Sequence, residues 1–201
     1  MEKLNQKRNP VLLIHGIWDT GKVFYKMVPY LNERGWDKVY HLDLKPNNGD
    51  APLEELAQQV AEFAIATFGD EQIFDLIGFS MGGIISRYYV QRLGGIKKIQ
   101  RFITISSPHN GTLTGYGSLK PGCKQMRYDS ELLADLNKDI EMLKEIEFTS
   151  IWTPYDLMIL PPTSSKISFG REVTLPVLVH AWMLTDSRCL EAVTEGLMVN
   201  G

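Results

Sequence analysis

Short apolar runs alternate along this chain with segments of helical periodicity, and that alternation restricts the fold more than any other feature. The apolar runs, which predict six strands, are residues 11–14, 39–42, 73–79, 101–105, 148–152 and 177–179. The segments with helical spacing are residues 20–31, 53–68, 84–93, 129–143 and 187–197. Strands that alternate with helices build parallel sheets through βαβ units. We therefore expect a single α/β domain over residues 1–201, with a doubly wound, mostly parallel six-stranded sheet and helices on both faces.

Composition excludes several classes of protein. The 201 residues are 44% hydrophobic and 22% charged with a net charge of −3, which suits one globular core. Two cysteines are too few for a disulfide framework or a metal cluster. The basic residues are scattered, so we do not expect a nucleic-acid partner. Neither a secretory signal nor an apolar run of the ~18 residues that span a bilayer is recognised, and we expect a cytoplasmic protein with no transmembrane segment.

A Gly-x-Ser-x-Gly pentapeptide lies where a predicted strand meets a predicted helix. Ser80 is its central residue, with Gly78 and Gly82 on either side. A sharp strand-to-helix turn exposes the serine hydroxyl, and glycine at both flanking positions avoids the clash that a side chain would make there. The helix N-terminus adds positive potential and free N–H groups. This pattern predicts that Ser80 is a catalytic nucleophile.

Three motifs together resemble the α/β-hydrolase superfamily, and within it the small, lidless bacterial lipases and esterases. They are residues 11–17 (VLLIHGI), 78–83 (GFSMGG) and 107–112 (SPHNGT), and the resemblance extends from about residue 10 to residue 197. Acyl transfer needs two donors for the oxyanion of the tetrahedral intermediate. One is the N–H of Met81, the residue after the nucleophile. The resemblance implies that the other is the N–H of Ile17, and that His15 shapes this loop.

The order of the triad in this fold is serine, acid, histidine, which restricts the general base to the histidines after Ser80. They are His109 and His180. His109 precedes every plausible acid, so we expect it to structure its own loop. His180 follows the last predicted strand, and residues 180–184 (HAWML) before a terminal helix resemble the catalytic-histidine loop of the family, although Val179 stands where glycine is common. His180 is the predicted base.

The acid must lie between Ser80 and His180 at the carboxyl end of a strand. Asp156 follows the predicted strand 148–152 directly and matches the acid position of the family. The other candidates are expected to cap a helix, to lie on its polar face or to precede a strand, and they are Asp129, Asp135, Asp139, Glu145 and Glu147. The predicted triad is therefore Ser80, His180 and Asp156, and no cofactor or metal is expected because no metal-ligand spacing or phosphate loop is present.

Apolar residues cluster beside the predicted site. Those expected to bind the substrate are Trp18, Leu157, Met158 and Trp182. Such a surface beside a nucleophile suits an acyl chain or a lipid–water interface. We therefore expect a small-molecule or lipid ester as substrate and transient contact with a lipid interface. A chain of 201 residues has no room for a large cap, which predicts an open, shallow cleft.

These features predict a serine hydrolase of the lipase or esterase type, which cleaves acyl-glycerols or similar lipid esters through an acyl-enzyme. Two alternatives share the motifs. The same triad serves thioester hydrolysis or transfer of the acyl group to an acceptor other than water. A non-catalytic relative that binds lipids or a protein partner is an alternative of another class.

Overall fold

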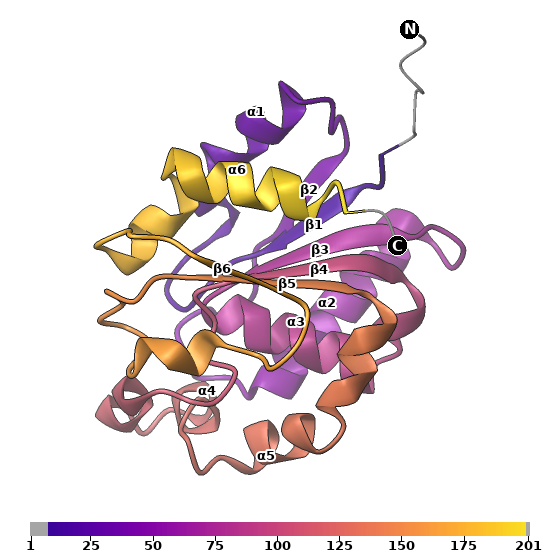
Figure 1. Cartoon of the computed structure of the whole chain (residues 1–201). Coiled ribbons are helices and arrows are strands. Elements are labelled where there is room, and N and C mark those ends of the chain that lie inside the picture. The colour runs from indigo at the N-terminus through magenta and orange to yellow at the C-terminus, as the bar shows by residue number, and fades with distance from the viewer. Residues whose placement is uncertain (1–7, 200–201) are drawn as a thin grey trace, which may run out of the picture.

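A parallel sheet of six strands forms the centre of the computed structural model, which describes residues 8–199 (Figure 1). The strands are β1 (Val11–Ile14), β2 (Val39–Leu42), β3 (Phe74–Phe79), β4 (Ile99–Ile105), β5 (Glu147–Trp152) and β6 (Arg171–Thr174). Their order across the sheet is β2-β1-β3-β4-β5-β6, and every neighbouring pair is parallel. The predicted α/β class with helices around a parallel six-stranded sheet is confirmed.

Helices cover both faces of the sheet. Below it in Figure 1 lie α2 (Leu53–Phe68), α3 (Met81–Arg92), α4 (Pro121–Gln125) and α5 (Glu131–Lys138); above it lie α1 (Met27–Asn32) and α6 (Ser187–Gly196). Side chains of a strand alternate between the two faces. Leu12 and Ile14 accordingly belong to the core shared with α2 and α3, whereas Val11 and Leu13 belong to the core shared with α1 and α6.

The sixth strand was expected at residues 177–179, and that prediction is wrong. The strand is β6, an edge strand whose residues alternate between half-buried and exposed, so only Val173 contributes an apolar side chain. Residues 177–179 are apolar for another reason. Val177 packs in the core with α6, whereas Leu178 and Val179 are exposed. The hydrophobic residues 177–179 therefore lie in a connection, whereas the mostly polar residues 171–174 form the strand.

Two predicted helices are each divided in the structure. Residues 20–31 form a short 3-10 helix, η1 (Gly21–Phe24), followed by α1. Pro29 explains the break, because proline lacks the N–H of a helix interior and its ring clashes with the carbonyl four residues earlier. The segment 129–143 is divided into α5 and the 3-10 helix η4 (Ile140–Glu145) at Asp139, whose φ of −124° is not helical.

All six strands point the same way, so their carboxyl ends share one edge of the sheet, on the left of Figure 1 and far from both described ends of the chain. The loops at this edge carry the 3-10 helices η3 (Leu113–Gly117), η5 (Pro162–Ser165) and η6 (His180–Leu184). Within residues 8–199 there is no large cap over this edge. Among the described helices none combines the length and the apolar character that a membrane crossing needs.

Candidate active site

Ser80 forms the turn between β3 and α3. Its φ of 54° is in the left-handed region, which a serine adopts only where the surroundings enforce it. The turn is tight: a Cβ on Gly78 would lie 2.5 Å from Gly83 Cα, and a Cβ on Gly82 would lie 2.4 Å from the carbonyl oxygens of Ile14 and His15. Glycine at these positions therefore lets α3 start directly against β1 and β3, with Ser80 between them.

Two backbone N–H groups beside Ser80 are available to a ligand. They belong to Met81, the first residue of α3, and to Ile17, and neither donates to a protein acceptor within residues 8–199. Gly16 brings the loop of Ile17 against the nucleophile, because a Cβ at this position would lie 3.1 Å from Ser80 Cβ. The two donors predicted for the oxyanion thus flank the serine.

The loop that carries Ile17 is a tight turn held from both sides. Asp19 N–H donates to Gly16 O at 3.4 Å, and Trp18, at φ 61°, donates its N–H to Asn47 O at 2.7 Å. His15 lies beneath this turn and is fully buried. Its Nε2 accepts from Leu44 N–H at 3.0 Å, which leaves the proton on Nδ1 to donate to Gly16 O at 2.8 Å. Burial lowers the pKa of His15, so the neutral imidazole shapes the loop.

Asp156 and His180 lie together although 24 positions separate them. His180 Nδ1 donates to Asp156 Oδ2 at 2.7 Å, and Asp156 is 1% exposed. The second oxygen, Oδ1, accepts from the N–H groups of Met158 and Ile159 at 2.9 Å each. Burial alone would raise the pKa of Asp156, but the His180 hydrogen bond and charge together with the two amides hold it below its ordinary value. The carboxylate is thus ionised and fixes which imidazole nitrogen carries the proton.

The imidazole of His180 is placed beside the nucleophile by aromatic contact. His180 belongs to η6, between β6 and α6, and its ring lies 4.8 Å from the ring of Phe79, the residue before Ser80. The expectation that His180 directly follows the last strand is wrong, since β6 ends at Thr174. Within the described chain, Ser80 Oγ and His180 form no hydrogen bond; such contacts are often long before a substrate binds.

His109, the other histidine after Ser80, is part of the core. It is fully buried, its Nε2 lies 3.0 Å from Thr104 Oγ1, and its ring packs edge-on against Phe148. Burial, reinforced by the charge of Arg87, lowers its pKa well below the ordinary value. His109 is therefore a neutral core histidine, as expected for a residue that structures its loop.

Three of the remaining acid candidates are engaged elsewhere. Asp135 and Asp139 both form ion pairs with Arg92 at 2.8 Å, on α5 and at its end. Asp129 accepts from the Tyr116 hydroxyl at 2.6 Å. Asp186, which follows His180 and therefore falls outside the expected order of the triad, caps α6 by accepting from Arg188 N–H at 3.0 Å. Of the acids weighed from the sequence, Asp156 is the one that contacts a histidine.

Two threonines that the sequence analysis did not single out hold the loop of Asp156. The hydroxyls of Thr112 and Thr114 both donate to Met158 O, at 3.0 and 2.7 Å, and Thr112 Oγ1 also accepts from Leu160 N–H at 2.9 Å. The motif at residues 107–112 ends on Thr112 and was the available signal. The threonines act through Asp156, because they fix the segment whose N–H groups bind its carboxylate.

The four residues predicted to bind the substrate all project from loops at the carboxyl edge. The exposed fractions are 63% for Trp18, 76% for Leu157, 42% for Met158 and 57% for Trp182. Each is next to or within three residues of a predicted catalytic or oxyanion residue. They therefore place exposed apolar surface on the loops that carry the predicted site.

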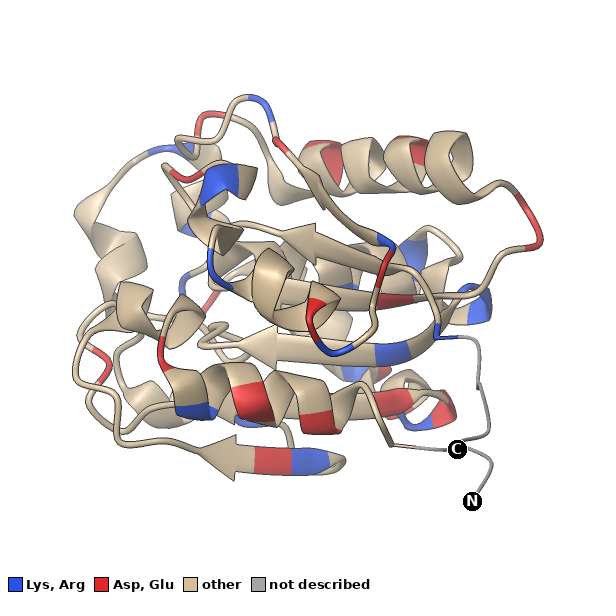
Figure 2. Ribbon diagram, turned by 90° about the horizontal axis from the view of Figure 1, so that it is seen from above, with Lys and Arg blue, Asp and Glu red and all other residues tan. Residues whose placement is uncertain are grey.

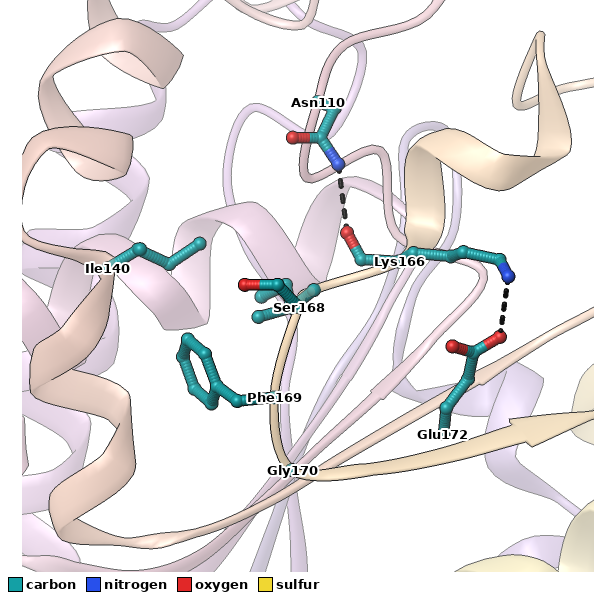
Figure 3. Close-up of a pocket in the computed structure, with 8 residues that line it drawn as sticks. Asn110, Ile140, Lys166, Ser168, Phe169, Gly170 and Glu172 are labelled. Carbon is teal, nitrogen blue, oxygen red and sulfur yellow. Dashed lines mark hydrogen bonds and ion pairs between the residues drawn. The ribbon is translucent and has the colours of Figure 1, made fainter.

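A separate hollow of about 430 Å³ lies between η4 and the segment that enters β6 (Figure 3). Asn110 Nδ2 donates to Lys166 O at 2.8 Å along its wall, and Lys166 Nζ pairs with Glu172 at 3.0 Å. It contains none of the predicted catalytic residues. Among residues 8–199 no three histidines, cysteines or acids come together as a metal site.

The sheet order, the two helical layers and a serine at the turn from β3 to α3 define an α/β-hydrolase fold. Solved lipases share it. The mature Bacillus licheniformis lipase superposes with a TM-score of 0.78 at 12% identity, covering 97% of this chain and 94% of the lipase. Aspergillus fumigatus lipase B superposes with a TM-score of 0.81 at 18% identity, covering 96% of this chain and 53% of that one.

Residues 10–155 match the palmitoyl protein thioesterase family, and the chain belongs to that family. A curated relative, palmitoyl-protein thioesterase 3 of Dictyostelium discoideum, is 32% identical over 107 residues, which is 51% of this chain. The match spans only 36% of that relative's length. The chain thus has the fold of the solved lipases and belongs to the palmitoyl protein thioesterase family.

Proposed function

We propose that this chain is a serine hydrolase that releases acyl groups from thioesters and esters through a covalent acyl-enzyme. The observation that carries the proposal is the buried Asp156–His180 hydrogen bond of 2.7 Å beside the left-handed Ser80. A carboxylate on Nδ1 leaves Nε2 free to accept a proton, and this is the arrangement that a serine nucleophile needs. The triad Ser80, His180 and Asp156 is the proposed catalytic machinery.

The reaction would proceed in two halves. Ser80 Oγ attacks the acyl carbonyl carbon and gives its proton to His180 Nε2, while the N–H groups of Ile17 and Met81 bind the oxyanion. Collapse of this intermediate expels the thiolate or alkoxide, which takes the proton from His180. Water then adds to the acyl-enzyme with His180 as base, and the same proton returns to Ser80 as the free acid leaves.

Thioesters are favoured as substrates by the family to which the chain belongs. The matched region, residues 10–155, includes Ser80 and both oxyanion donors, whereas the solved lipases share the fold alone. The open carboxyl edge agrees with an acyl chain that is attached to a bulky carrier, since the described chain has no cap that such a carrier would meet. Lipid oxoesters, the substrate class expected from the sequence, are the second candidate.

The test compares phenyl thiobutyrate with phenyl butyrate, which differ only in the atom that leaves. Wild type should hydrolyse both and react with a fluorophosphonate probe. Ser80→Ala should lose the label and several powers of ten in kcat/KM, about the loss typical of removing a triad nucleophile. Ser168→Ala is the matched control, because Ser168 is an exposed serine in the separate hollow. This variant should keep both the probe label and the wild-type kcat/KM. Turnover and labelling that survive Ser80→Ala would refute the mechanism, and faster cleavage of the oxoester would favour the second candidate.

A further inference from the structure

Large apolar side chains are exposed mainly at one edge of this molecule. Of the fifteen exposed large hydrophobic residues in the described chain, eleven lie on the loops beyond the carboxyl ends of the strands. We name these eleven the apolar rim: Trp18, Leu113, Tyr116, Leu119, Tyr128, Tyr155, Leu157, Met158, Leu178, Val179 and Trp182. The rim comes from four loops that are far apart in sequence, and three of them also carry Ile17, Asp156 or His180 of the proposed active site.

Three stretches of these loops, which bear eight of the eleven rim residues, contain no charged residues. Residues 106–119, 157–165 and 173–185 are 36 positions without Lys, Arg, Asp or Glu, in a chain of which 22% is charged. The long loops at the arrowhead ends of the strands accordingly show uninterrupted tan stretches in Figure 2. Placing a charge in an apolar medium is expensive, so a surface without charges can leave water at low cost. This composition fits contact with hydrocarbon better than contact with solvent.

The rim is held in shape by hydrogen bonds between its loops. Leu113 N–H donates to Leu160 O at 2.9 Å, and the hydroxyls of Thr112 and Thr114 both bind Met158 O. The hydroxyl of Tyr128 also donates to Leu160 O. Because the loops are already ordered, contact with a flat partner requires little further ordering of the chain.

The rim is wider than one acyl chain needs. Leu113, Leu119 and Leu178 are 57%, 79% and 64% exposed, and none of them adjoins a residue of the proposed triad. An acyl chain in the cleft would contact the residues next to Ser80, Asp156 and His180 and leave these outer leucines in water. Apolar surface of this extent is typical of an interaction site.

We propose that the apolar rim docks this protein on a zwitterionic lipid surface, with the outer leucines inserted among the acyl chains. The proposal rests on the proposed function, because it names the surface on which that site would meet its acyl substrates. Anionic lipid is not the expected partner, since the three stretches that bear most of the rim are uncharged and the chain has a net charge of −3. The two basic residues that adjoin the rim are engaged within the chain: Lys120 pairs with Asp50 at 3.1 Å, and Arg127 donates to the carbonyls of Gly115 and Ser118. Binding through apolar insertion should therefore depend little on ionic strength.

The experiment measures co-sedimentation of the full-length Ser80→Ala variant with phosphatidylcholine vesicles, so that binding is separated from turnover. The expected result is binding that persists at high salt, with a blue shift in tryptophan fluorescence from Trp18 and Trp182. Leu119→Ser and Leu178→Ser should each weaken vesicle binding about tenfold. Ile65→Ser is the matched control, because this residue is 60% exposed on α2, away from the rim, and binding should be unchanged.

Hydrolysis of soluble phenyl butyrate by Leu119→Ser and Leu178→Ser in the active background should equal that of wild type, which shows that both variants fold. Absence of vesicle binding, equal losses in Leu178→Ser and Ile65→Ser, or binding restricted to anionic vesicles would each overturn docking. A rim covered by a second copy of the chain, seen as a dimer that Leu178→Ser dissociates, would also overturn it. Loss of soluble-ester turnover in Ser80→Ala is scored separately, so the two proposals fail independently.

Discussion

Replacing Asp156 by asparagine tests the proposed mechanism most directly, because it changes one atom of the Asp156–His180 contact. In the structure Oδ2 accepts the Nδ1 proton of His180 at 2.7 Å, while Oδ1 accepts two backbone N–H groups at 2.9 Å. The asparagine oxygen can still accept from the N–H groups of Met158 and Ile159, so its amide nitrogen faces His180. That nitrogen is a donor, and Nδ1 must then accept from it, which moves the imidazole proton to Nε2.

A proton on Nε2 prevents His180 from taking the proton of Ser80. The wrong tautomer in a serine triad lowers kcat by about 10⁴, which is about 5 kcal/mol of transition-state stabilisation. The fold should change little, since both backbone donors keep their acceptor. We therefore expect kcat/KM for phenyl thiobutyrate to fall by three to four powers of ten, on the order that this tautomer effect predicts, with the unfolding midpoint nearly unchanged.

The matched control for this substitution is Asp186→Asn. Asp186 caps α6, and asparagine caps helices about as well as aspartate, so activity and stability should both stay at the wild-type level. The assay is steady-state hydrolysis together with a urea unfolding curve for each variant. If Asp156→Asn kept its activity within about tenfold of wild type, the tautomer argument would be refuted.

Two further predictions concern the packing behind the nucleophile and a buried carboxylate. Gly83→Ala should destabilise the chain by about 2 kcal/mol, because its Cβ would lie 1.9 Å from Ser107 Oγ. In a double-mutant cycle measured by urea unfolding, Ser107→Gly should recover most of that loss, and additive losses would contradict the clash. Burial raises the pKa of Asp75 from 3.8 to about 6, although Arg101 lies 3.2 Å away. The folded state therefore binds the proton more tightly than the unfolded state, and this contribution to stability is complete below about pH 4 and is lost as the pH rises through 6. This amounts to about 3 kcal/mol, and wild type should therefore lose stability relative to Asp75→Asn between about pH 4 and pH 7 in parallel unfolding curves. A constant difference between the two curves would show that Asp75 does not titrate in this range.

Sequence patterns located the elements whose burial is regular. The helix α2 begins and ends where its apolar stripe and the flanking Pro52 and Gly69 predict, and the fully buried β1 has the predicted bounds. The edge strand β6 was missed because only Val173 among its four residues is apolar. Hydrophobicity indicates burial rather than strand pairing. A half-exposed edge strand such as β6 therefore gives a weaker hydrophobic signal than an apolar loop nearby.

Chain order and strand ends brought Asp156 and His180 forward as candidates, but they could not predict the contact between them. That contact depends on the path of the loop after β5, which Thr112 and Thr114 hold from more than forty positions earlier in the chain. The hydroxyl of Thr153 donates to Val177 O at 2.6 Å and ties the ends of the two loops together. Such long-range hydrogen bonds leave no periodic pattern in the sequence.

The turn at Trp18 places stability and activity in opposition. A left-handed backbone costs a residue with a side chain about 1 kcal/mol that glycine would not lose, yet tryptophan stands here at φ 61°. The stability of the fold is therefore reduced in order to hold a bulky indole next to Ile17, a proposed oxyanion donor. Stabilising this protein by the usual replacement of strained residues would remove that indole, so Trp18 should be kept in any variant designed for thermostability.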